Sequence, residues 1–171
     1  GKLACTDAAR AAACYTDLLA TSAASSTVRA AALRGAVVTG GDAGLALWQE
    51  AISANDGDAV NAALRAVLDT PKDAKATQIF TTALTKHPDV QTRLAKVLGL
   101  RGDKAAVPPA WRITLQAEDD RVMSGLGNFL LAMNAHINSD FPRVLAEVGL
   151  TGPDGSRKAD HNRYNNRLDS L

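Results

Sequence analysis

Apolar positions repeat along residues 26–107 with a period near 30. The tetrapeptide Ala32-Leu33-Arg34-Gly35 is followed 31 residues later by Ala63-Leu64-Arg65-Ala66. An apolar set in the second copy is followed 30 residues later by a similar one: Val60, Leu64, Val67 and Leu68, then Val90, Leu94, Val97 and Leu98. Each copy has room for two short helices. Because one helix pair cannot bury its own apolar stripe, the pattern predicts pairs that stack on their neighbours.

The breaks between the expected helices repeat as well. Asp42, Asp73 and Asp103 follow turns that contain Gly or Pro, at spacings of 31 and 30. Aspartate is a favoured N-cap residue, so each is predicted to cap the next helix. Arg34 and Arg65 hold equivalent repeat positions and are predicted to make inter-repeat contacts to these capping aspartates.

These repeats resemble short bacterial HEAT-type repeats, in which a V-R-x-A-A-L-R helix follows a G-D-x-x-A-L helix. The resemblance covers residues 26–107 and implies a HEAT-like antiparallel helical-pair solenoid. Residues 6–19 have helical spacing of their own and are predicted to form an N-terminal capping helix, so the repeat region of this all-α chain is expected to span residues 1–107. In that helix Cys14 is predicted to be a small core residue. Since HEAT-like arrays mostly serve as scaffolds or binding surfaces, the resemblance also implies a protein partner on the repeat surface.

Pro108-Pro109 interrupts the pattern, and residues 108–171 are expected to form a C-terminal helical region. Short helices are predicted from residue 111 to 116, 143 to 148 and 158 to 168. A longer helix is predicted from Asp119 or Asp120 to about Asn138, with Leu126, Leu130, Met133 and Ile137 as its apolar stripe. Trp48 and Trp111 are predicted to anchor the core, and His87 to be a turn residue.

Polar side chains of several types, namely imidazoles, carboxylates and amides, lie close together in the sequence of this C-terminal region. His136 and Asp140 are four residues apart, beside Asn134 and Asn138, and a second group contains Asp160, His161, Arg163 and Asn165. Buried groups of these types need partners. The cluster is therefore a closed hydrogen-bond network, a metal site or a catalytic site.

Besides a binding pocket without chemistry, two interpretations of the cluster stay open. In the structural one, Asp140 caps the following helix, His136 bonds a carbonyl or Asp160, and the asparagines hold a loop. In the other, His136, Asp140 and His161 bind zinc, iron or manganese. Asp160 would then orient a ligand or act as general base, and the binding residues would be Asn134, Asn138, Arg163 and Asn165.

Residues 111–168 also resemble an uncharacterised family of bacterial helical domains, through the motif N-A-H-I-N-x-D and a later D-H-x-R-x-N. That family has no activity to carry over, so the resemblance marks positions and implies no reaction. The domain of that family is longer on its N-terminal side. In this chain, repeat-like helices occupy the corresponding place.

Composition narrows the function classes. Aromatic residues make up 4% of the chain, which favours close-packed helices over a sheet. The formal net charge of +1 gives no reason to expect nucleic acid or an anionic membrane as partner.

Cys5 and Cys14 lie nine residues apart in one expected helix and are not expected to form a disulfide. Free thiols favour the cytoplasm over secretion. The start at Gly1 is compatible with removal of a signal peptide, so the compartment stays open.

The sequence therefore predicts a helical-repeat scaffold or protein-interaction module. The alternative is a small metal-dependent enzyme, hydrolase-like, that uses His136, Asp140, Asp160 and His161.

Overall fold

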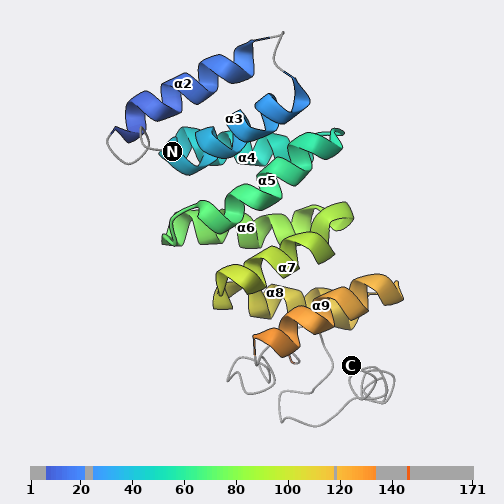
Figure 1. Ribbon diagram of the computed structural model, residues 1–171. Helices are drawn as coiled ribbons and strands as arrows, with labels where there is room; N and C mark the ends of the chain where they lie inside the picture. Colours follow the sequence, from blue (N-terminus) through green and yellow to red (C-terminus); the bar gives the residue numbers. More distant parts are fainter. Residues whose placement is uncertain (1–6, 22–24, 118, 134–145, 147–171) are drawn as a thin grey trace. The chain divides into compact units, whose positions relative to one another are not determined.

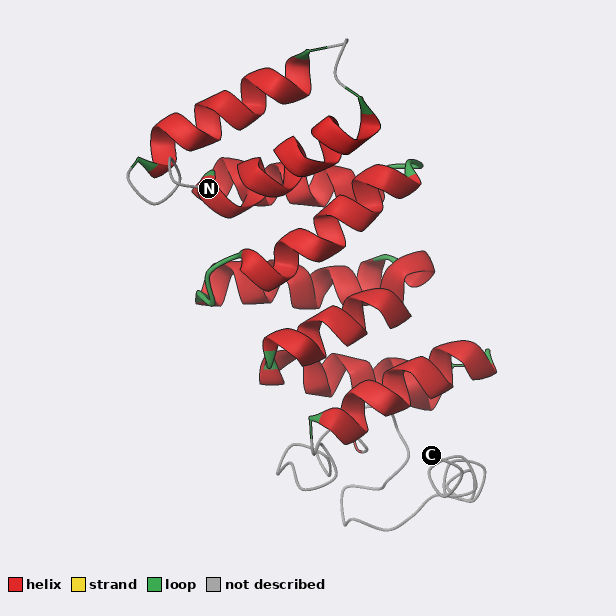
Figure 2. Ribbon diagram, in the orientation of Figure 1, coloured by secondary structure: helices red, strands yellow, loops and turns green. Residues whose placement is uncertain are grey.

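The computed structural model describes residues 7–21, 25–117, 119–133 and 146. Within these ranges the chain forms helices joined by short turns, and no strand occurs (Figure 2). The prediction of an all-α chain is confirmed for this part of the protein. The chain divides into two compact units, Gly1–Ala83 and Leu84–Leu171, and the division falls inside helix α6 (Ala74–Lys86).

The first unit contains α2 (Ala8–Ala20), α3 (Ser26–Thr39), α4 (Gly41–Ser53), α5 (Gly57–Asp69) and most of α6. Side-chain caps start α2, α3 and α5: Asp7, Ser25 and Asp56 accept hydrogen bonds from backbone N–H groups in the first turns of these helices. Helix α3 packs against α2, α4 and α5. In Figure 1, α3 and α5 lie in front of α4.

The second unit contains the end of α6, the 3₁₀ turns η1 (Pro88–Val90) and η2 (Lys104–Ala106), and helices α7 (Gln91–Arg101), α8 (Val107–Gln116) and α9 (Asp120–Ala132). Helix α9 packs against α7 and α8. Pro108 and Pro109 lie in the first turn of α8, where the N–H groups that proline lacks would have no helical partner. The prolines thus start a helix. The expected domain boundary at 107/108 stays a prediction.

Burial repeats with a constant offset of 31 along α3, α5, α7 and α9. The sets of equivalent positions are Ala32, Ala63 and Leu94; Leu33, Leu64, Ala95 and Leu126; and Ala36, Val67, Leu98 and Phe129, all of them buried. The offset of 30 read from the sequence also pairs buried residues, Val60 with Val90 and Leu64 with Leu94, but it does not hold for the whole apolar set. It would pair Leu68, which is 46% exposed, with Leu98, which is fully buried.

A buried aromatic residue lies on each of the helices α4, α6 and α8, namely Trp48, Phe80 and Trp111. In the first unit, the rings of Trp48 and Phe80 lie 4.6 Å apart between centroids, and Nε1 of Trp48 donates a hydrogen bond of 2.9 Å to the carbonyl of Ala63. The prediction that both tryptophans anchor the core is confirmed.

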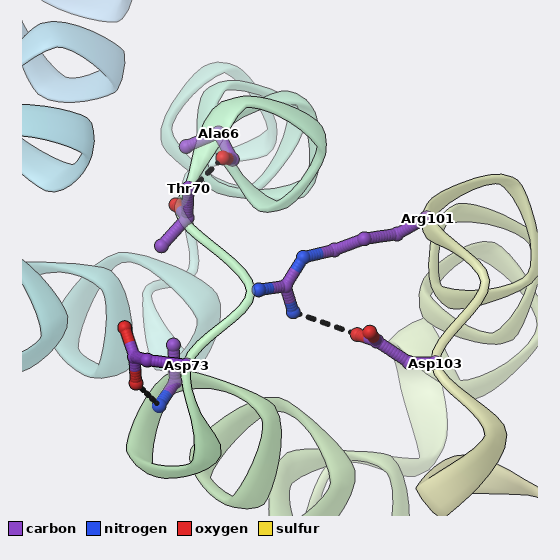
Figure 3. Close-up of polar contacts among 6 residues, drawn as sticks. Ala66, Thr70, Asp73, Arg101 and Asp103 are labelled. Atoms are coloured by element: carbon purple, nitrogen blue, oxygen red, sulfur yellow. Dashed lines mark hydrogen bonds and ion pairs between the residues drawn. The ribbon is translucent and has the colours of Figure 1, made fainter.

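One of the three predicted aspartate caps is confirmed and two are wrong. Asp73 accepts a hydrogen bond of 2.7 Å from the N–H of Ala76 at the start of α6 (Figure 3). Asp42 already lies inside the first turn of α4, whose N-cap is Gly40, and its carboxylate instead pairs with Lys75 at 2.6 Å.

Asp103 precedes η2 but does not cap it with its side chain. Its carboxylate lies 2.6 Å from Nη1 of Arg101 (Figure 3), and the two side chains are 4% and 1% exposed. A buried guanidinium requires a counter-charge, so this ion pair takes the carboxylate away from the cap.

The prediction that Cys14 is a core residue is wrong. Cys14 is exposed on α2, and the buried residue of that helix is Ala11. Helix α2 packs against α3, its buried and half-buried residues lie at helical spacing on one face, and Cys14 lies outside that face. Cys5 lies outside the described residues.

Candidate interaction groove between α3 and α5

The polar cluster predicted from the sequence lies outside the residues that the structure describes. This holds for Asn134, His136, Asn138, Asp140, Asp160, His161, Arg163 and Asn165. Their roles in a network, a metal site or a binding site stay predictions. Within the described ranges, no group of three or more His, Cys, Asp or Glu residues is placed to hold a metal ion.

The described part of the chain offers a different candidate site, an open groove of about 350 Å³ between α3 and α5 in the first unit. We call it the α3–α5 groove. The residues that line it are Ser26, Thr27, Ala30, Ala31, Arg34, Asp58, Asn61, Ala62 and Arg65. All come from the repeat elements that the sequence predicted, although the groove itself was not predicted.

Helical periodicity explains why these residues share one groove. On α3 they follow one another at intervals of about one turn from Ser26 to Arg34, and on α5 from Asp58 to Arg65. The adjacent stripes of both helices are buried and hold the helices together, for example through Leu33 and Leu64. Alanines line the middle of the groove, where short side chains leave space between the helices.

The two ends of the groove differ in charge. Ser26, Thr27 and the carboxylate of Asp58 lie near the N-terminal ends of α3 and α5, whereas Arg34 and Arg65 lie toward the C-terminal ends. The groove therefore has one acidic, hydroxyl-bearing end and one basic end.

Arg34 connects the two helices at the basic end. Its Nη2 and Nε lie 2.5 Å from Oδ2 of Asp69 on α5. The hydrogen bond with Asp69, followed by the negative charge of that carboxylate, raises the pKa of Arg34 above its ordinary value despite partial desolvation. The predicted contact with a capping aspartate is therefore wrong, because Asp69 ends α5 and caps no helix.

Arg65 is the second guanidinium of the basic end. It is exposed, and no other residue in the described ranges forms a hydrogen bond or ion pair with it. Lys96 holds the equivalent position on α7 and is exposed as well, so positive charge recurs at offsets of 31. Arg34 and Arg65 can be found in the sequence because both repeats have the same residue at this position. Lys96 is a different residue type and is recognised as equivalent only with the offset of 31.

A second hollow of about 350 Å³ adjoins the acidic end of the α3–α5 groove and shares Ser26, Ala30 and Asp58 with it. It adds Arg29 and Asp56. The carboxylate of Asp56 accepts hydrogen bonds from the N–H groups of Asp58 and Ala59 and is occupied in capping α5. Asp58 is thus the carboxylate at this end that is open to a ligand.

Part of the chain matches a protein-family model. Residues 93–171 match a family of unknown function, DUF5995. The match covers the segment whose motif resembles an uncharacterised helical family, and it begins within α7, beyond the α3–α5 groove. No HEAT family model matches the repeats.

Neither the curated proteins nor the solved structures contain a significant match to the chain. In the part of the chain that the structure describes, no helix has the length and apolar character needed to cross a membrane.

Proposed function

We propose that the protein is a helical-repeat interaction module and that the α3–α5 groove holds a segment of a protein partner. The observation that carries the proposal is the groove itself, because it lies between α3 and α5 and exposes the guanidinium of Arg65, which has no partner among the described residues. The proposal also treats residues 1–107 as a HEAT-like solenoid followed by a C-terminal helical region.

The constant offset of 31 supports this architecture. In helical repeats each unit packs mainly on its neighbours, so equivalent residues are buried in every copy and equivalent surface residues form lines along the array. The buried sets on α3, α5, α7 and α9 follow that rule. The exposed residues Arg34, Arg65 and Lys96 repeat along the sequence with the same offset of 31.

Photo-crosslinking tests the proposal. A photoreactive amino acid in place of Ala31 reports on the groove, and the same amino acid in place of Ala46, which is exposed on α4 outside the groove, is the control. We expect position 31 to capture one polypeptide reproducibly, identified by mass spectrometry, with the crosslinked site confined to one segment of it. Equal capture at both positions, or none at position 31, would contradict the proposal.

A further inference from the structure

We propose that the ligand of the α3–α5 groove is an extended acidic peptide segment, in which an Asp or Glu side chain meets Arg65 and a hydrogen-bond donor about three residues away meets Asp58. This inference rests on the proposed function and adds the chemistry of the partner.

The basic end of the groove selects a carboxylate. The guanidinium of Arg34 is occupied by Asp69, while that of Arg65 has no partner among the residues that the structure describes. A guanidinium presents its donors in a planar fork that matches a carboxylate and forms charge-assisted hydrogen bonds with it. The pair between Arg34 and Asp69 also ties α3 to α5 beside Arg65, which fixes the width of the groove at this end.

The acidic end sets the spacing. Asp58 and Arg65 are seven residues apart on α5, a rise of about 10 Å along the helix. An extended peptide advances about 3.3 Å per residue, so about three residues cover that distance. A Lys, Arg, Ser or Thr side chain at that spacing from the acidic residue can donate to Asp58.

The alanines between the two ends fit an extended backbone better than a helix. Ala30, Ala31 and Ala62 line the middle of the groove, and short side chains let another main chain approach closely. Asn61 lines the same stretch of the groove.

The carboxylates in and beside the groove disfavour a nucleic acid strand. Asp58 lines the groove, Asp56 lines the adjoining hollow and Asp69 flanks the basic end. A chain of phosphates would pass these negative charges at close range, and the protein as a whole has a formal charge of only +1. A peptide with one acidic and one donor side chain complements both ends.

Selection from a random peptide phage library on the full-length protein tests the inference. Parallel selections use the wild type, Arg65→Glu and the matched control Lys72→Glu, which reverses an exposed charge outside the groove. We expect the wild type and Lys72→Glu to enrich peptides with Asp or Glu about three residues from Lys, Arg, Ser or Thr. In solution, Arg65→Glu should weaken binding of a selected peptide about tenfold or more, and Asp-to-Lys exchange in the peptide should restore part of the loss.

The outcomes separate the two proposals. Enriched peptides that occupy the groove without an acidic residue, or that bind Arg65→Glu as tightly as wild type, would overturn the inference and leave the interaction module intact. Enrichment of no peptide at all would count against both. A single-stranded oligonucleotide that binds the wild type more tightly than the selected peptides and depends on Arg65 would overturn the choice of a peptide. Unchanged far-UV circular dichroism and melting temperature confirm that each variant is folded.

Discussion

The backbones of α3 and α4 come close together at Gly44. A Cβ atom at this position would lie 2.6 Å from the carbonyl oxygens of both Ala36 and Val37, which are main-chain atoms and cannot rotate away. Contacts under about 3 Å of this kind force neighbouring backbone to shift. The requirement for glycine here thus comes from the packing of one helix pair.

Gly44→Ala should lower the free energy of unfolding by about 1–3 kcal/mol, the usual range for overpacking. Gly57→Ala is the matched control, because a Cβ atom there meets nothing within 4 Å. Urea denaturation of both variants measures the difference. Similar values for the two would mean that the close approach at Gly44 is not present in solution.

The buried ion pair of the second unit offers a second test at single residues. Asp103→Ala leaves the guanidinium of Arg101, whose side chain is 1% exposed, without this counter-charge, which should cost about 3–5 kcal/mol. Asp42→Ala removes a pair of the same length, 2.6 Å, whose side chains are 77% and 60% exposed. That variant should lose less than about 1 kcal/mol. Thermal unfolding monitored by circular dichroism compares the two, and equal losses would contradict the burial of Arg101.

At the scale of the elements, the sequence predicted the helices well and their register less well. Alanine-rich apolar stripes and capping residues are local signals, and they predicted helices throughout the repeat region, the cap of α6 at Asp73 and the start of α9 at Asp119 or Asp120. Register depends on which apolar residue faces a neighbouring helix. Leu68 and Leu98 both fit an apolar stripe by residue type, so only packing reveals that one is exposed and the other buried.

Leu98→Ala and Leu68→Ala test the register directly. With an offset of 31, Leu98 corresponds to the buried Val67, and its truncation should cost about 2–5 kcal/mol. Truncation of Leu68 should change stability by no more than about 1 kcal/mol, because its side chain is already 46% exposed. Chemical denaturation gives both values. Comparable losses would favour the offset of 30.

The candidate site was predicted less completely than the helices. Arg34 and Arg65 stand out in the sequence as a repeated pair, but their partners were assigned to capping aspartates. The actual partner of Arg34 is Asp69, 35 residues further along the chain. The groove arises from two helices meeting in space, and no local pattern carries that information. Cys14 was misassigned for the same reason, since the side of α2 that faces α3 cannot be identified from the sequence of one helix.

At the scale of the whole molecule, the C-terminal polar cluster keeps two interpretations that metal analysis separates. A closed hydrogen-bond network predicts a metal-free wild type, and a loss of about 1–3 kcal/mol on His136→Ala. Metal analysis by inductively coupled plasma mass spectrometry compares the wild type with a His136→Ala/Asp140→Ala double variant. Nearly stoichiometric zinc, iron or manganese that disappears in the double variant would establish the metal interpretation.

The most direct test of the interaction module is a steric block of the α3–α5 groove. Ala31→Trp places a large side chain in the groove at an exposed helical position, and Ala46→Trp adds the same side chain on α4 outside it. The measurement is the dissociation constant, by fluorescence anisotropy, of a peptide selected on the wild-type protein. We predict that Ala31→Trp abolishes binding while Ala46→Trp binds like the wild type. Binding that survives Ala31→Trp in a folded variant would show that the ligand lies elsewhere and would contradict the account.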